Sequence, residues 1–456
     1  MHDRTKALLE QRRARCLPGV ETAHVFQFQE RLTTSQWQPR AQLEAFQLAS
    51  LKTLIDHTRA HNPFWQVRLP EAALSATTVN EALARIPLLS RSAVQEAGER
   101  LSTTVLPSGQ NCVGTRSSSG STGMPVSVLV TDYAMGWQNA LNLRAHIWAL
   151  RDFDRTIASI RRNKPGLADY PEGTRRPAWD APSIFPFQTG ESIYLNALTS
   201  VQDQWEWLAR MQPAYLMTYP SLLNELADIA RKAGPPPRWL RGASAVGETV
   251  GPEIRETVRK GLGVDIHETY SAEEVGMIAI QCPTSRRLHC QSESIIVEVL
   301  DDRGAACKPG EVGRVVVTPL HNFATPLFRY DIGDLAEVAA PCACGRHLPS
   351  LARVMGRQRN ILRLADGRTF WPSFGRKTIR KIGHIRQQQF RQTTYSRLEA
   401  HLVADRPLTD EERSLITAEI QSKLPAPFDV AVVEVAAIRR SESGKFEEFI
   451  CEVGAG

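Results

Sequence analysis

One run of small residues between positions 117 and 125 sets the first expectation about the fold: Ser117-Ser118-Ser119-Gly120-Ser121-Thr122-Gly123-Met124-Pro125. Glycines let a backbone come close to a ligand, and hydroxyls donate hydrogen bonds without needing a charge. Such a loop directly before a strand is typical of a site for an anionic group, although a flexible polar turn is the alternative. No Gly-Lys-Ser/Thr follows at the spacing of a kinase-type P-loop, which disfavours that class of nucleotide site.

The composition around this loop is that of an ordinary globular protein. The chain has 456 residues, of which 42% are hydrophobic and 23% charged, and its formal net charge is +6. This length predicts two to three domains and a core that needs no disulfides. The mild basic excess favours an anionic small molecule and is too weak to indicate nucleic acid. Without a long apolar run or a secretory h-region, we expect a cytoplasmic protein with no membrane partner.

The pattern of hydrophobic residues predicts an α/β protein with two domains. Residues 126–131 indicate a strand, and residues 294–300 and 311–320 indicate a β-hairpin. Helical periodicity covers residues 37–61 and, broken by turns at Pro213 and Tyr219-Pro220, residues 200–233. After Gly356 the chain changes to a basic segment followed by strand-like, helical and strand-like runs. We therefore expect a large N-terminal α/β domain over residues 1–356 and a small, mobile α+β domain over residues 357–456.

Three further motifs follow the hydroxyl-rich loop in the chain. Tyr270-Ser271-Ala272-Glu273-Glu274-Val275-Gly276 places acidic residues at the end of a predicted strand, where α/β proteins bind ligands. Phe328-Arg329-Tyr330-Asp331-Ile332-Gly333-Asp334 ends another predicted β segment with an exposed aspartate, and Arg440-Ser441-Glu442-Ser443-Gly444-Lys445-Phe446 offers a single lysine on a glycine-containing turn. Each motif alone is more typical of an ordinary turn, so their order carries the information.

Together these segments resemble the adenylate-forming superfamily of acyl-CoA synthetases and adenylation domains. The resemblance is greatest to the branch of phenylacetate–CoA ligase and related adenylating proteins of capsular polysaccharide synthesis, and it extends to residues 86–91 and 387–392. It implies an ATP- and Mg²⁺-dependent ligase that converts a carboxylic acid, expected to be aromatic, into an acyl-AMP with release of pyrophosphate. The ligase would then pass the acyl group to a thiol, with coenzyme A as the expected acceptor. An amine or a carrier protein as the acceptor, and a non-catalytic nucleotide-binding protein that has kept the fold, stay open as alternatives.

The resemblance also implies roles for individual residues. Those expected to hold the ATP phosphates are Ser118, Gly120, Ser121, Thr122 and Gly123. Glu274 corresponds to a catalytic residue that binds Mg²⁺. Those expected around the adenosine are Gly247, Glu248 and Tyr270 at the adenine, and Asp334 and Arg357 at the ribose. Lys445 corresponds to the catalytic lysine between the acid and the α-phosphate, where an ammonium neutralises developing charge. Tyr219, on a proline turn, is the candidate for the acid pocket.

Two departures from the family pattern concern the hinge and the loop. The family commonly has an aspartate two residues after the arginine that corresponds to Arg357, and this chain has Arg359-Asn360 there. The loop ends in Met124-Pro125-Val126, where other branches have a lysine. We expect the hinge between the two domains at residues 356–360, without its usual acidic pivot.

Four of the eight cysteines, Cys282, Cys290, Cys342 and Cys344, fall in two short segments, and the first segment also contains His289. Cys282 and His289 form one pair, and Cys342 and Cys344 form the other. Three thiolates and one imidazole satisfy a tetrahedral Zn²⁺, and a closed set of four ligands is typical of a structural site. Cys290 competes with His289 for the fourth position, and reduced, unliganded thiols are the alternative.

A basic stretch covers residues 376–386 of the C-terminal domain. It could hold phosphates of coenzyme A or an acidic carrier, but a solvated helix face is the more common explanation for such a charge run.

Overall fold

The computed structural model describes residues 10–11, 20–103, 105–118, 125–164, 166–179, 187–370, 374, 376–438, 440 and 446–453. The chain divides into two compact units, Met1–Met355 and Gly356–Gly456. Among the described residues, no helix combines the length and the apolar character that a membrane crossing requires.

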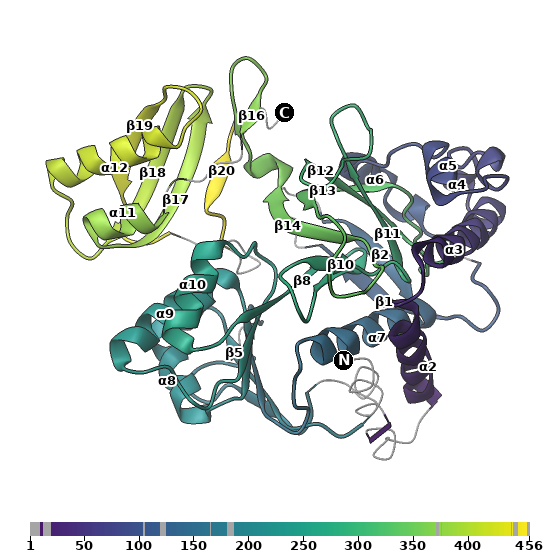
Figure 1. Ribbon diagram of the computed structural model, residues 1–456, viewed down its shortest axis with the longest axis horizontal. Helices are drawn as coiled ribbons and strands as arrows, with labels where there is room; N and C mark the ends of the chain where they lie inside the picture. The colour runs from purple at the N-terminus through teal and green to yellow at the C-terminus, as the bar shows by residue number, and fades with distance from the viewer. Residues whose placement is uncertain are drawn as a thin grey trace. The chain divides into compact units, whose positions relative to one another are not determined.

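A twelve-stranded sheet organises the larger unit (Figure 1). Its strand order is β11-β12-β13-β14-β10-β9-β8-β7-β6-β3-β5-β4. The parallel half contains β3 (Ile157–Arg161), β5 (Ser192–Asn196), β6 (Tyr215–Thr218), β7 (Gly242–Ala245) and β8 (Ile266–Ala272), with β4 (Thr174–Arg176) antiparallel at its edge. The other strands are β9 (Gly276–Gln281), β10 (Leu288–Cys290), β11 (Ile295–Leu300), β12 (Val312–Pro319), β13 (Tyr330–Val338) and β14 (Ser350–Arg357). The carboxyl ends of the parallel strands face one edge, where an α/β sheet binds its ligand.

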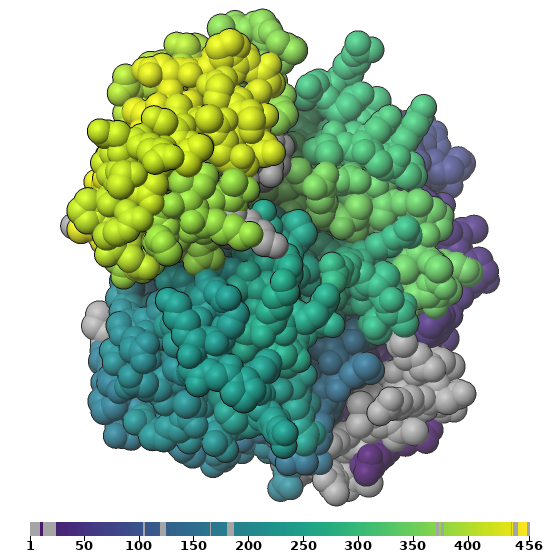
Figure 2. All heavy atoms as spheres, turned by 60° about the vertical axis from the view of Figure 1, so that its left-hand side comes forward, coloured from purple at the N-terminus to yellow at the C-terminus, as the bar shows by residue number. Residues whose placement is uncertain are grey.

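Helices cover this sheet because each carries one apolar face. Figure 1 shows α8 (Val201–Met211), α9 (Pro220–Ala233) and α10 (Pro252–Leu262) side by side next to the parallel half, and Figure 2 shows the same helices as a closely packed teal surface. Leu222, Leu226 and Ala230 of α9 are buried at helical spacing. The helices before the sheet are α2 (Val20–Ser35), α3 (Arg40–His61), α4 (Pro63–Gln66), α5 (Val79–Ala84), α6 (Arg91–Ala97) and α7 (Asp132–Trp148).

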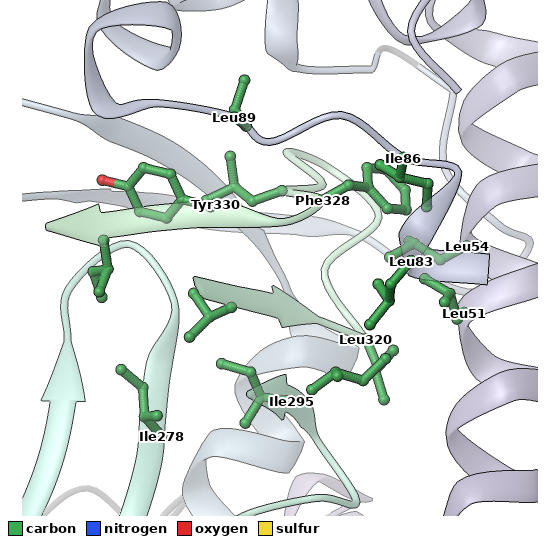
Figure 3. Packing of buried hydrophobic residues seen from close by; sticks show 14 of the residues in the cluster. Leu51, Leu54, Leu83, Ile86, Leu89, Ile278, Ile295, Leu320, Phe328 and Tyr330 are labelled. Carbon is green, nitrogen blue, oxygen red and sulfur yellow. The ribbon is translucent and has the colours of Figure 1, made fainter. Parts of the chain in front are cut away.

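The apolar core of the antiparallel half also fixes the chain segment that precedes α6. Leu51 and Leu54 of α3 pack in one cluster with Leu83, Ile86 and the strands β11–β13 (Figure 3). Figure 3 shows Leu89 directly across from Tyr330, and the backbone confirms a parallel β-bridge between these two residues. A separate ribbon of β1 (Cys112–Ser117) and β2 (Ser127–Thr131) carries the hydroxyl-rich loop between its strands.

The smaller unit is an α+β domain, as predicted. Its four-stranded sheet has the order β19-β18-β17-β20, and a hairpin of β15 (Leu362–Arg363) and β16 (Thr369–Phe370) precedes it. The strands and helices are β17 (Ile385–Thr394), β18 (Arg397–Ala404), β19 (Asp429–Glu434), β20 (Phe449–Cys451), α11 (Arg376–Gly383) and α12 (Asp410–Ser422). Thr409 caps α12 through a capping box with Glu412, which explains the sharp start of this helix.

The structure thus confirms the α/β class and corrects two local predictions. Residues 200–233 are not simply helices broken by turns. Between α8 and α9 the chain forms strand β6, which lies in the interior of the sheet. Asp334 does not end a β segment and is not exposed. It lies within β13, and its exposed fraction is 7%.

Candidate active site

Glu274 lies at the centre of a hydrogen-bonded network that joins three distant parts of the sequence. Arg91 Nη1 donates to Glu274 Oε1 at 3.1 Å, and the Tyr330 hydroxyl donates to the same oxygen at 3.1 Å. Arg91 Nη1 also donates to the Tyr330 hydroxyl at 3.2 Å, and Arg91 Nη2 donates to Ser118 Oγ at 2.8 Å. The Glu274 side chain is only 2% exposed, so these partners offset the cost of burying its charge.

Local backbone structure positions each member of this network. The bridge between Leu89 and Tyr330 is closed by Leu89 N to Arg329 O at 3.0 Å and Asp331 N to Leu89 O at 2.9 Å. Ser90 then caps α6, so Arg91 is the first residue of that helix. Glu274 lies in the turn between β8 and β9, which passes so close to α7 that a Cβ on Gly276 would be 2.2 Å from Gln138 Oε1.

Ser118 closes the base of the predicted phosphate loop. Its backbone N–H donates to Val126 O at 2.8 Å, and its Oγ accepts from Val126 N at 2.9 Å. The other predicted loop residues, Gly120, Ser121, Thr122 and Gly123, lie outside the described residues. Ser118 and Val126, on either side of the loop, are thus hydrogen-bonded to each other, and Arg91 connects Ser118 to Glu274.

Tyr270 and Asp334 form a second buried pair. The Tyr270 hydroxyl donates to Asp334 Oδ2 at 2.7 Å, and the two side chains come from β8 and β13. This hydrogen bond satisfies one oxygen of the buried Asp334 carboxylate. Two of the five residues predicted around the adenosine are therefore in direct contact.

Gly247 and Glu248 follow β7 at the carboxyl edge of the sheet. Gly247 has a φ of +78°, which glycine adopts without strain. Glu248 accepts from the backbone N–H and the hydroxyl of Ser221 at 3.0 and 3.1 Å, and so places its negative charge at the N-terminus of α9. Tyr219 precedes that helix, is buried in the core of the parallel half, and accepts from Arg162 N at 3.3 Å through its hydroxyl.

Two predicted residues belong to the smaller unit. Arg357 ends β14 with a half-buried side chain, next to Gly356 with a φ of +106°. Lys445 lies outside the described residues.

The cysteine and histidine pairs come together in the larger unit. The ligand atoms of Cys282, His289, Cys342 and Cys344 lie within 4.8 Å of one another. Cys282 Sγ is 3.8 Å from Cys342 Sγ, and Cys344 Sγ is 3.3 Å from His289 Nε2. Zinc bonds of about 2.3 Å to sulfur and 2.0 Å to nitrogen at tetrahedral angles put such atoms about 3.8 and 3.5 Å apart. His289 Nδ1 lies 3.1 Å from Leu348 O, which directs Nε2 toward the thiols.

The pKa values of Cys282 and Cys290 shift in opposite directions. Burial alone would raise the pKa of Cys282, but hydrogen bonds from His289, Thr284 and Ser285 lower it to about 4. Burial raises the pKa of Cys290 to about 12, and this residue does not belong to the cluster. In the active site, burial and then the neighbouring Glu274 carboxylate raise the pKa of the Tyr330 hydroxyl, so Tyr330 is a hydrogen-bond donor at neutral pH.

Sequence reasoning missed Arg91 and Tyr330 as members of the site. Both lie in segments that resemble the family, but a single arginine or tyrosine carries no local signal. Their sequence separation is 239 residues, and the bridge at Leu89 helps to bring their segments together.

Comparisons with known proteins agree with this geometry. No family model matches the chain. It is 27% identical over 344 residues to a phenylacetate–coenzyme A ligase of Thermus thermophilus, covering 71% of the chain and 72% of the relative. It is 22% identical over 400 residues to a phenylacetate–coenzyme A ligase of Pseudomonas putida, covering 84% and 87%.

Solved structures share the fold over nearly the whole chain. A 2-hydroxyisobutyryl-CoA ligase in complex with its acyl-AMP superimposes with a TM-score of 0.72 at 18% identity, covering 91% of each chain. A benzoate CoA ligase from Burkholderia xenovorans has a TM-score of 0.52 at 14% identity, covering 75% and 69%. The chain is therefore similar in sequence to phenylacetate–coenzyme A ligases and shares the fold of these CoA ligases.

Proposed function

We propose that the protein is an ATP-dependent ligase that activates a carboxylic acid as an acyl-AMP, releases pyrophosphate and transfers the acyl group to coenzyme A. The sequence relatives favour an aromatic acid as the substrate. The observation that carries the proposal is the convergence of Ser118, at the base of the phosphate loop, and the buried carboxylate of Glu274 on one arginine.

Each residue of the site suits a part of the first half-reaction. The loop from Ser118 binds the phosphates, and the Asp334 carboxylate can accept hydroxyl donors from the ribose in addition to Tyr270. An oxygen of the acid attacks the α-phosphorus, and the bond to the pyrophosphate oxygen breaks. Lys445 neutralises the charge that develops in this step. Glu274 has the hard oxygen ligands that Mg²⁺ prefers, and the ion would supply charge neutralisation on the phosphates.

Pyrophosphate exchange tests this proposal directly. Labelled pyrophosphate should enter ATP only when a suitable acid is present, and a panel of aryl and alkyl acids will identify it. Glu274→Gln keeps the shape of the side chain and should reduce exchange by at least about 10²-fold. Absence of exchange with every acid would favour the alternative, a nucleotide-binding protein without catalysis.

The acceptor requires a separate experiment, because the first half-reaction is common to thiol, amine and carrier-protein ligases. Purified acyl-AMP and enzyme, mixed with coenzyme A, should give the acyl-CoA at a rate well above hydrolysis. If coenzyme A has no effect and an amine or a carrier protein accelerates turnover, the ligase belongs to one of the alternative types.

We also propose that Cys282, His289, Cys342 and Cys344 hold a structural Zn²⁺. Support comes from the near-tetrahedral spacing of their ligand atoms and from the orientation of His289 by Leu348 O. A set of four protein ligands has no open position for a substrate, so the ion would connect the β9–β10 hairpin to the loop before β14. Reduced thiols of this kind suit a cytoplasmic protein.

Metal analysis of the purified protein should find about one Zn per chain. Cys342→Ser should remove the metal and lower the melting temperature, whereas Cys290→Ser, which changes the neighbouring thiol outside the cluster, should keep the metal. Adenylation per folded molecule should persist in both variants. A metal-free protein with full thermal stability would contradict the site.

Finally, we propose that residues 357–456 act as a mobile domain that turns about a hinge at residues 356–360. The positive φ of Gly356 suits a change of chain direction at this position. Such a domain would present Lys445 for adenylation and withdraw it for transfer to the thiol.

A further inference from the structure

Arg91 connects the two groups expected to serve ATP. Its guanidinium donates to Ser118 Oγ at 2.8 Å with one nitrogen and to Glu274 Oε1 at 3.1 Å with the other. The Arg91 side chain is 22% exposed, against 2% for Glu274, so the arginine keeps access to solvent.

The charges of the site require Arg91 to have more than one partner. Without nucleotide, Arg91 and the Tyr330 hydroxyl are the donors to the Glu274 oxygen, and a buried carboxylate without such a cation is strongly destabilising. A metal ion held by Glu274 would take over the neutralisation of this carboxylate. The guanidinium then needs a new anion, and the phosphates bound by the loop from Ser118 are the nearest ones expected.

We propose that Arg91 is a phosphate-binding residue that exchanges partners. In the nucleotide-free protein it compensates Glu274, and in the complex with Mg²⁺ and ATP it binds the β- and γ-phosphates and the pyrophosphate that leaves. The proposal rests on the proposed function, because it assumes that ATP is cleaved at this loop. A planar guanidinium suits the task, since its parallel N–H groups match two phosphate oxygens.

The anchoring of the chain makes such an exchange possible. The backbone beside Arg91 is held by the Leu89–Tyr330 bridge and by the Ser90 cap, so a change of partner needs only side-chain rotation. The Tyr330 hydroxyl stays on Glu274 from the rigid strand β13 and keeps the carboxylate oriented. Arg91 as a fixed structural link between Glu274 and Ser118 is the competing explanation.

The two explanations differ in pyrophosphate binding, which calorimetry measures without any acid. The variants are Arg91→Gln, Arg91→Lys and a control, Arg85→Gln, whose arginine pairs with Glu81 on the nearby helix α5. We expect Arg91→Gln to weaken the binding of Mg²⁺–pyrophosphate about 10- to 100-fold. Arg91→Lys should recover part of this loss, and Arg85→Gln should bind like the wild type.

A second measurement separates phosphate binding from fold stability. Adenylation by Arg91→Gln should fall with the loss of pyrophosphate affinity, whereas transfer from preformed acyl-AMP to coenzyme A should keep its rate, because that step involves no pyrophosphate. Wild-type pyrophosphate affinity in Arg91→Gln, or equal losses in both half-reactions, would overturn the proposal. Failure of the proposed function has a different signature, namely no acid-dependent exchange in the wild type.

Discussion

Replacement of Asp334 by asparagine tests whether the buried pair of Asp334 and Tyr270 binds the ribose hydroxyls of ATP. Asp334→Asn preserves the size of the side chain but removes its charge and one acceptor oxygen. Hydrogen bonds to a charged group contribute about 1.5–3 kcal/mol, which corresponds to roughly 10- to 150-fold in the dissociation constant for ATP. Tyr270→Phe removes only the 2.7 Å hydrogen bond to Asp334 and leaves the carboxylate in place, so its effect should be smaller.

The assay compares ATP with 2′,3′-dideoxy-ATP in pyrophosphate exchange, at a saturating concentration of the acid. The wild type should prefer ATP, because only ATP offers hydroxyl donors to Asp334. Asp334→Asn should lose most of this preference while its KM for the acid stays unchanged. If Asp334→Asn loses the same affinity for both nucleotides, the aspartate stabilises the strand and does not contact the ribose, and the assignment is wrong.

Three other predictions follow from the site and the core. Lys445→Ala should lower adenylation about 10²-fold or more while transfer from preformed acyl-AMP continues; equal losses in both steps would refute its role. Limited proteolysis should cut first near Arg357 and give fragments of about 39 and 11 kDa of the 50.8 kDa chain, with protection by ATP plus acid; a cut indifferent to ligand would contradict the hinge. Burial lowers the pKa of His321 to about 4, so this histidine is neutral in the folded protein at neutral pH. As the pH falls from about 6.5 through 4, protonation favours the unfolded chain, and the free energy of unfolding should drop by up to about 3 kcal/mol. His321→Gln should flatten the dependence of the melting temperature on pH over this range, and an unchanged slope would show that another group titrates.

Local patterns in the sequence predicted what depends on local chemistry. The hairpin of β11 and β12 follows from runs of β-branched residues. The cysteine pairs were predictable as one cluster because zinc restricts the ligand types and their number. In the hairpin the signal lies in neighbouring residues, and in the cluster it lies in two short segments of recognisable ligand types.

The remaining features depend on contacts between distant segments. Strand β6 has four residues and no alternation, so its place between β3 and β7 comes from burial inside the sheet. The burial of Asp334 depends on the Tyr270 hydroxyl, which lies 64 residues earlier in the chain. The position of Arg91 depends in the same way on the bridge between Leu89 and Tyr330, two residues too far apart in the sequence to be recognised as one motif.

The bridge at Leu89 has a consequence for how the chain folds. It joins residues 241 positions apart by backbone hydrogen bonds, and such long loops close slowly because their entropy must be lost before the contacts form. The proposed nucleotide site is therefore expected to mature among the last features of the larger unit, after the sheet has assembled. Recovery of pyrophosphate binding during refolding would then report the completion of the native topology, whereas circular dichroism would report the earlier formation of helices.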